Sequence, residues 1–156
     1  MKTVVVISDT HNNLMNVPGL KSIMDECDMI ISLGDTGYDY NALNALYGDK
    51  LVAVRGNCDP GYELPDERII EVEGVILYIT HGHIYRVKAT NELLIKRAKE
   101  INADAVLYGH THIAESIMSD KLKVINPGVL SGAGRLSYAY LVVNSGNIFA
   151  RNVYLT

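Results

Sequence analysis

The chain has 156 residues, of which 48% are hydrophobic and 21% charged, and its formal net charge is −4. These values are ordinary for a globular protein, and the length is sufficient to bury a proper core, so we expect one domain over residues 1–156. The acidic and basic residues are mixed along the sequence and do not form the basic stripe with which proteins bind long nucleic acid. No apolar run reaches the ~18 residues of a membrane span. Two cysteines, Cys27 and Cys58, are too few for a disulfide framework, and no signal peptide is visible, which favours a cytoplasmic protein.

The first half of the chain predicts alternating strands and helices. Short apolar runs rich in β-branched residues predict buried strands at residues 3–8, 29–33 and 51–54. Apolar residues at helical spacing predict a helix over 14–27, whose first turn is disturbed by Pro18-Gly19, and a shorter helix over 40–47. This order predicts parallel strands joined by right-handed crossovers.

The second half contains more strands. A hairpin is predicted over 68–72 and 75–80, followed by an amphipathic helix over about 89–102. Further strands are predicted at residues 105–108, 114–118, 122–125, 137–143 and 148–154. Helices early and late in the chain would then flank two sheets, so the predicted fold class is a layered α/β sandwich.

All five histidines fall in three short motifs, each of which follows a predicted strand. The motifs are Asp9-Thr10-His11, His81-Gly82-His83 and Gly109-His110-Thr111-His112. In extended backbone, side chains at i and i+2 leave the same face, so the first and third motifs would each aim two potential metal ligands at one spot. The pattern therefore predicts a metal site assembled at strand ends.

Seven residues of ligand type follow the strands, and they are more than one ion normally takes. They are Asp9, His11, Asp35, Asn57, His81, His110 and His112. Two divalent ions that share a bridging carboxylate fit this number better, and mixed nitrogen and oxygen ligands suit manganese, nickel, iron or zinc. Such a pair lowers the pKa of a bound water from 15.7 to about 7 and neutralises phosphoryl oxygens. We therefore expect a phosphoesterase in which metal-bound hydroxide attacks phosphorus.

Five motifs, in this order, resemble the signature motifs of the calcineurin-like metallophosphoesterases. They are Asp9-x-His11, Gly34-Asp35, Gly56-Asn57-Cys58-Asp59, His81-Gly82-His83 and Gly109-His110-Thr111-His112. The small size and Asn126-Pro127-Gly128 resemble the compact prokaryotic phosphodiesterase branch. The resemblance implies a four-layer αββα sandwich with two mixed sheets. It also implies that Asp9, His11 and His112 hold one ion, that Asn57, His81 and His110 hold the other, and that Asp35 bridges them.

The same reasoning predicts the roles of the remaining candidates. Asp35, Asn57 and His81 are the predicted catalytic residues, and manganese or nickel is expected before iron or zinc. Many family members carry histidine where this chain has Cys58, and a thiol cannot replace an imidazolium, which favours diesters over monoesters. Cys58, His83 and Arg135 are expected near the substrate, although each also fits a structural or solvent-facing role. Relatives often have serine where this chain has Val129.

Two alternatives stay open. The chain also resembles the metallophosphoesterase-like retromer subunit, which uses this fold as an interaction scaffold. An enzyme acting on phosphomonoesters or nucleic-acid ends is the other alternative. For the leading hypothesis we expect a small phosphodiester substrate and neither stable nucleic-acid binding nor a membrane, while the closing strand with Tyr154 leaves room for a homo-oligomer.

Overall fold

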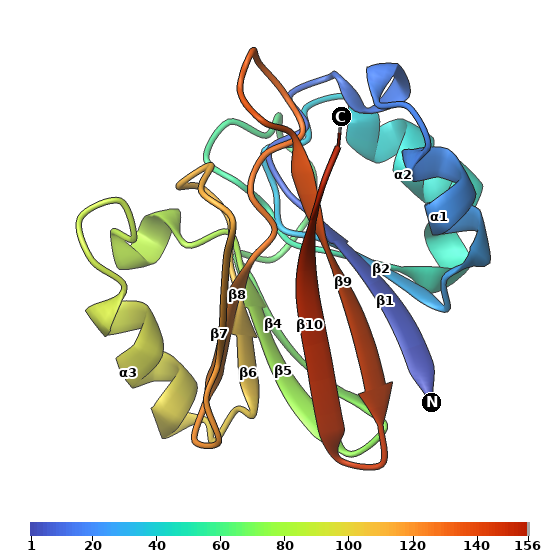
Figure 1. Cartoon of the computed structure of the whole chain (residues 1–156). Helices are drawn as coiled ribbons and strands as arrows, with labels where there is room; N and C mark the ends of the chain where they lie inside the picture. The colour runs from blue at the N-terminus through green and yellow to red at the C-terminus, as the bar shows by residue number, and fades with distance from the viewer. Residues whose placement is uncertain (156) are drawn as a thin grey trace.

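Two five-stranded sheets pack face to face, with helices on the outer side of each (Figure 1). This computed structural model describes residues 1–155, so Thr156, the last residue of the predicted domain, lies outside the described residues. The architecture is the predicted four-layer α/β sandwich, and both sheets mix parallel and antiparallel strands. None of the described helices has the length and apolar character needed to cross a bilayer.

The first sheet is built from both ends of the chain and has the strand order β10-β9-β1-β2-β3. Strands β1 (Lys2–Ile7), β2 (Met29–Ser32) and β3 (Leu51–Ala53) are parallel, as predicted. Helices α1 (Leu20–Glu26) and α2 (Asp39–Tyr47) connect them, and a 3₁₀ turn, η2 (Gly48–Lys50), precedes β3. The C-terminal hairpin of β9 (Ser137–Asn144) and β10 (Asn147–Tyr154) joins β1 in antiparallel register.

The second sheet has the order β4-β5-β6-β8-β7. The predicted hairpin is β4 (Glu67–Val72) and β5 (Val75–Thr80), and β6 (Ala105–Leu107) lies parallel to β5. Strands β7 (Glu115–Met118) and β8 (Lys123–Asn126) complete the sheet. Helix α3 (Glu92–Glu100) covers the outer face, and a 3₁₀ turn, η3 (His83–Tyr85), follows β5 (Figure 1).

The alternation of side chains along β1 explains why the layers hold together. Val4 and Val6 enter the apolar core between the sheets, whereas Val5 and Ile7 enter the core under α1 and α2. Successive residues of a strand point to opposite faces, and each of these four side chains is fully buried. Burial of a side chain of this kind contributes about 1.5–3 kcal/mol, which makes β1 a central element of both cores.

The helix predicted over 14–27 is instead two elements. A 3₁₀ turn, η1 (Leu14–Asn16), ends at Val17, which has extended backbone with ψ 103°, and α1 begins only after Gly19 at φ 76°. A residue before proline is disfavoured in helical geometry, so Pro18 forces Val17 out of the helix. The helix predicted from residue 89 likewise begins later, at Glu92.

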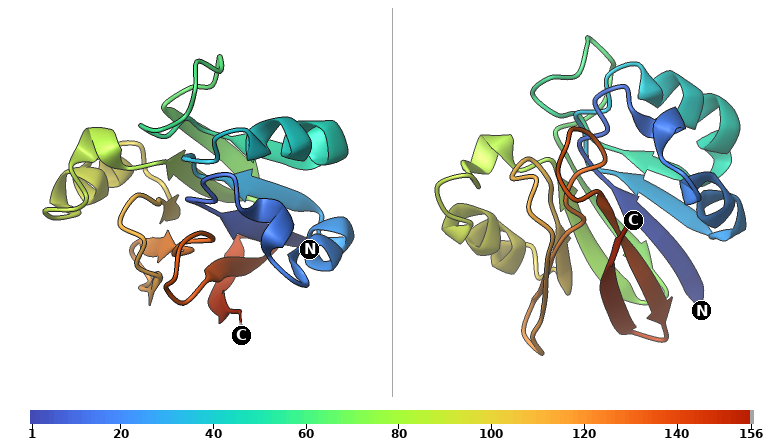
Figure 2. Two further views of the ribbon diagram at one scale, coloured as in Figure 1. Left: turned by 90° about the horizontal axis from the view of Figure 1, so that it is seen from above. Right: turned by 45° about the horizontal axis from the view of Figure 1, so that its top comes forward.

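The loops that follow β1, β2, β3, β5 and β6 meet at one end of the molecule (Figure 2). Backbone hydrogen bonds join them directly. Asp9 N donates to Gly34 O at 3.0 Å across the first sheet, and Gly109 N donates to His81 O at 3.1 Å across the second. The polar motifs are therefore held side by side by the ends of strands from both sheets.

Candidate metal centre

Six of the seven predicted ligands form two groups at this end of the sheets. The donor atoms of each group lie within 4.8 Å of one another. The first group is Asp9, His11 and His112, and the second is Asp35, His81 and His110. Each group combines one carboxylate with two imidazoles, so each is a candidate site for a divalent cation.

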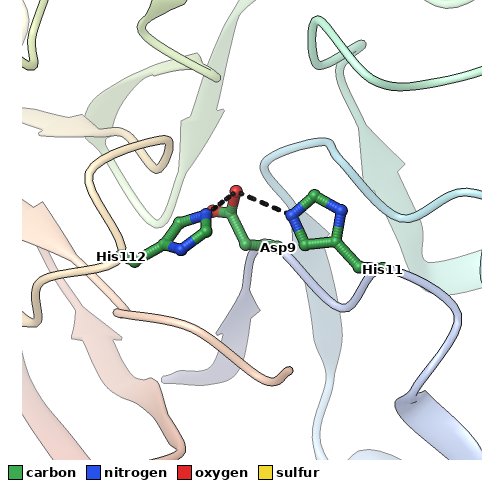
Figure 3. Close-up of side chains that lie close together, drawn as sticks. All are labelled: Asp9, His11 and His112. Carbon is green, nitrogen blue, oxygen red and sulfur yellow. Dashed lines mark hydrogen bonds and ion pairs between the residues drawn. The ribbon is translucent and has the colours of Figure 1, made fainter. Parts of the chain in front are cut away.

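In the first group, the carboxylate of Asp9 lies between two imidazoles (Figure 3). Its Oδ1 is 3.1 Å from His112 Nε2 and 3.7 Å from His11 Nε2. Asp9 is fully buried, whereas about one-third of the His11 side chain and nearly half of the His112 side chain are exposed. The group is therefore closed below by Asp9 and open toward solvent on the side of the histidines.

The second group lies beside the first, and Asp35 faces both. Asp35 Oδ2 is 3.3 Å from His81 Nε2 and 3.9 Å from His11 Nε2, which belongs to the other group. His81 Nε2 is also 3.1 Å from His110 Nδ1. This is the position that a carboxylate shared by two cations requires.

Several of the candidate ligands have left-handed backbone, which sets the direction of their side chains. Among residues 1–155, ten non-glycine residues have positive φ, and six of them are in the site loops: Asp9, His11, Asn12, Asp35, His110 and His112. Left-handed backbone is uncommon outside glycine and costs on the order of 1–3 kcal/mol per residue. Such strain persists where the surrounding structure imposes it, and it gathers at functional sites.

The extended backbone predicted for the first and third histidine motifs is wrong, and the predicted convergence holds only for the first. Asp9 and His11 do converge on one group, but His110 and His112 belong to different groups. His110 and His112 have φ of 67° and 61°, and Asp9 and His11 have φ of 56° and 43°, so the i, i+2 rule for strands applies to neither pair.

Asp59 holds the loop that carries Asp35, and sequence reasoning missed this role. Its Oδ2 accepts hydrogen bonds from Asp35 N at 2.9 Å and Gly56 N at 2.7 Å. Its Oδ1 accepts from Thr36 N at 2.8 Å and Gly37 N at 3.0 Å. The only signal in the sequence is the aspartate that closes Gly56-Asn57-Cys58-Asp59, and turn aspartates commonly accept backbone N–H groups without indicating which loop they hold.

Close approach of two loops explains the glycine that begins this motif. A Cβ on Gly56 would lie 2.1 Å from Asp35 Oδ1 and 2.4 Å from Asp35 N. Only a residue without a side chain lets the loop after β3 reach the loop after β2. Cys58 N then donates to Asp35 Oδ1 at 2.8 Å, which fixes the carboxylate from this side.

Two further contacts orient the histidines. His81 Nδ1 donates to Leu33 O at 2.7 Å, so in the neutral ring Nε2 carries the lone pair, and Nε2 lies toward Asp35 and His110. Metal-binding histidines usually donate their other ring nitrogen in this way. Asn126 belongs to the Asn126-Pro127-Gly128 motif, but its contacts were not predicted: it donates to Gly109 O at 3.1 Å and Thr111 Oγ1 at 3.0 Å and so holds the loop of His110 and His112.

The electrostatics of the site call for added positive charge. Burial raises the pKa of Asp35, but the hydrogen bond with His81 and its charge outweigh burial and hold this pKa well below its usual range. Burial lowers the pKa of His81, but Asp35 and the charge of Asp9 outweigh burial and leave it above its usual value. Burial and the neighbouring His81 lower the pKa of His110 to about 4, so its ring is neutral and ready to bind a metal.

A divalent cation fits these residues. Asp9 and Asp35 are buried carboxylates, and within residues 1–155 their only ion-pair partners are histidines, not lysine or arginine. A buried charge is stable only when it is paired or coordinates a metal. The donor set of carboxylates and neutral imidazoles supplies the ligands that first-row divalent metals accept.

The remaining predicted residues lie around the two groups. Asn57 is exposed, and its Nδ2 is 3.3 Å from the Sγ of Cys58, whose backbone N–H donates to Asp35. The His83 ring centroid is 5.4 Å from that of His81, and its Nδ1 is buried without a hydrogen-bond partner among the described residues. Arg135 is exposed and lies farther out, stacked 4.1 Å over the Tyr154 ring.

Fold and site together define an α/β protein with a carboxylate–histidine centre at the strand ends of two packed sheets. The sequence profile described as "Calcineurin-like phosphoesterase superfamily domain" matches residues 1–147. A probable metallophosphoesterase of Bacillus subtilis, YsnB, is 33% identical over 129 residues, which cover 80% of this chain and 73% of YsnB. The chain belongs to the calcineurin-like phosphoesterase superfamily. Membership of this superfamily implies that the protein hydrolyses phosphate esters.

Solved structures share the fold. An uncharacterized, predicted phosphoesterase of Streptococcus pneumoniae has a TM-score of 0.81 at 23% identity, covering 98% of this chain and 89% of that one. A novel archaeal phosphodiesterase has a TM-score of 0.76 at 25% identity, covering 98% and 99%. Vps29 of Entamoeba histolytica, complexed with Zn²⁺, has a TM-score of 0.74 at 20% identity, covering 97% and 98%.

Proposed function

We propose that this metallophosphoesterase is a phosphodiesterase that works with two divalent cations. The observation that supports the proposal most is the placement of two ligand groups on either side of Asp35. Asp9, His11 and His112 would hold one cation, His81, His110 and Asn57 the other, and Asp35 would contact both. When bound, the cations supply positive charge to the phosphoryl oxygens and lower the pKa of a coordinated water. Manganese or nickel is our first choice, with iron or zinc as alternatives.

The residues of the chain provide a rigid frame for this chemistry. Asp35 sets the separation of the two groups because its carboxylate faces both. The backbone N–H of Cys58 fixes that carboxylate, and the Asp59 carboxylate accepts the backbone N–H of Asp35. His81 is held in one tautomer by Leu33 O. A frame that is already ordered need not reorganise when charge develops on phosphorus, and this is where electrostatic catalysis gains most.

The chemistry around Asp35 favours diesters over monoesters. Burial raises the pKa of the Cys58 thiol, and the charge of Asp35 raises it further, so the thiol is neutral and supplies no positive charge. A phosphomonoester carries a charge of about −1.5 to −2 near pH 7, whereas a diester carries one. The likeness to the archaeal phosphodiesterase supports the same choice. We propose the cytoplasm as the compartment of this protein, and the exposed free thiol of Cys58 suits such a reducing environment.

A scaffold function is the alternative from a different class, and the likeness to Vps29 is its support. At 20% identity that likeness shows the fold alone. Six strained non-glycine residues lie in the loops that carry the two donor groups, and strain of this kind gathers at functional sites. These features favour the enzyme.

One set of assays separates these possibilities. After dialysis against a chelator, the protein is given Mn²⁺ or Ni²⁺ and assayed with bis(p-nitrophenyl) phosphate, p-nitrophenyl phosphate and a 2′,3′-cyclic nucleotide. We expect hydrolysis of the diesters to disappear with the chelator, return with the metal and exceed monoester hydrolysis.

The matched variants are Asp35→Asn, which alters the shared carboxylate, and Asp120→Asn, which changes an exposed turn residue. Asp35→Asn should lower diester turnover by more than about 100-fold, whereas Asp120→Asn should leave it intact. Turnover that survives the chelator, or an Asp35→Asn variant with full activity, would reject the proposal.

A further inference from the structure

A pocket of about 550 Å³ opens beside the first ligand group. Its lining includes His112, the loop of residues 131–134, Arg135 and Tyr154. Pockets of roughly 300–1,000 Å³ accommodate whole small molecules, so this space exceeds the needs of a single phosphate. If the phosphate of a diester sits at the ligand groups, one of its ester arms can occupy this pocket.

The pocket is fixed to the metal centre rather than merely close to it. Ser131 Oγ donates to Asp9 O at 2.8 Å, and Asn13 Nδ2 donates to Leu130 O at 2.9 Å. The loop wall is therefore anchored to the backbone of a proposed metal ligand. A Cβ added at Gly132 or Gly134 would have no atom within 4 Å, so the space around these two residues of the loop is open.

Arg135 supplies a cation to the lining of the pocket. Its guanidinium stacks on the Tyr154 ring, and no Asp or Glu within residues 1–155 forms an ion pair with it. The guanidinium carbon lies 4.1 Å from the ring centroid, and a guanidinium over an aromatic ring can still offer its N–H groups for a bidentate bond to a carboxylate or phosphate. Arg151 borders the adjoining hollow together with Arg135, which extends the positive charge across β10.

We propose that Arg135 determines specificity by binding a second anionic group on one arm of the phosphodiester substrate. That group is a carboxylate or a phosphate, and the arm spans the pocket from His112 to Tyr154. Neutral-armed diesters such as bis(p-nitrophenyl) phosphate would then be poorer substrates. This inference rests on the proposed phosphodiesterase function and names the class of substrate it acts on.

The kinetic test uses three p-nitrophenyl phosphodiesters whose second arm is propyl, 3-carboxypropyl or 3-phosphopropyl. With the Mn²⁺-loaded protein, we expect kcat/KM for the two charged arms to exceed that for propyl by about tenfold. In Arg135→Gln this ratio should fall to about one, and in Arg135→Lys it should be intermediate, because lysine keeps the charge but not the planar fork. Lys121→Gln, which removes a charge from the exposed β7–β8 turn, is the matched control and should keep the ratio.

A binding measurement separates this inference from the proposed function. Calorimetric titration with 3-carboxypropylphosphonate, which has no ester bond to hydrolyse, should show a Kd about tenfold weaker for Arg135→Gln than for Lys121→Gln. If all three diesters resist hydrolysis while this difference persists, the phosphodiesterase proposal fails and the anion subsite stands. If the diesters are hydrolysed without a preference for charged arms, or if Arg135→Gln keeps the preference, the subsite is refuted.

Discussion

Asp59 offers the sharpest test of how the site is held together. Its carboxylate accepts four backbone N–H groups, from Asp35, Thr36, Gly37 and Gly56, yet it is not itself one of the proposed metal ligands. The variant Asp59→Asn keeps the size of the side chain but retains only one acceptor oxygen. Two of the four backbone N–H groups would then face an amide NH₂ that cannot accept them.

The size of the effect follows from these bonds. A hydrogen bond to a charged group contributes about 1.5–3 kcal/mol, so the loss of two amounts to about 3–6 kcal/mol. Asp59 is half-buried, and water compensates part of this loss, so we expect the free energy of unfolding to fall by about 3 kcal/mol. For a chain of this length, 1 kcal/mol shifts Tm by about 2–4 °C, which predicts a drop of about 6–12 °C.

Calorimetry in the presence of a chelator measures this effect on the loop without any contribution from bound metal. Asp120→Asn is the control, because it removes a carboxylate from an exposed turn. A Mn²⁺ titration of the same proteins should show affinity about 10–100-fold weaker in Asp59→Asn, because residues that orient ligands matter on that scale. Equal Tm and equal Mn²⁺ affinity in the two variants would refute the role of Asp59.

Further predictions address the close approach of loops and the polar network under α3. Gly56→Ala should abolish Mn²⁺ binding because its Cβ would collide with Asp35, whereas Gly61→Ala, with open space around it, should bind normally in the same titration. Burial raises the pKa of Glu67, but hydrogen bonds from Tyr85 and Tyr78 and the charge of Arg97 outweigh it and hold the pKa below 4.5. A carboxyl whose pKa is lower in the folded than in the unfolded protein stabilises the fold at pH values above its unfolded-state pKa. The Tm of the unmodified protein should therefore exceed that of Glu67→Gln by the full amount near pH 7, and the difference should shrink as the pH falls below about 4.5. A Tm difference that does not depend on pH would contradict this.

The sequence was sufficient to predict most of the fold, because hydrophobic period and turn residues act locally. The parallel order of β1, β2 and β3 follows from the alternation of strands and helices. The break between η1 and α1 was underestimated, because apolar spacing continues across Pro18 while the backbone does not. Helical periodicity describes which side chains face the core, but not whether every residue between them is helical.

The site was predicted as a cluster but not in its detail. Strand ends that meet at one edge bring Asp9, Asp35 and the histidine motifs together, and this is topology that a sequence can indicate. The family resemblance already implied that His112 and His110 belong to different groups, whereas the spacing of the motif read as extended backbone placed both at one spot. Asp59 and Asn126 act on loops distant in the sequence, so their partners become known only when the chain is folded.

The central claim is that side chains from separate strand ends surround two cations. Crystals of the protein soaked in Mn²⁺, with diffraction measured at the manganese edge, test it most directly. We predict two anomalous peaks, one among Asp9, His11 and His112 and one among Asp35, His81 and His110. A single peak at saturating Mn²⁺, or peaks elsewhere on the surface, would contradict the account.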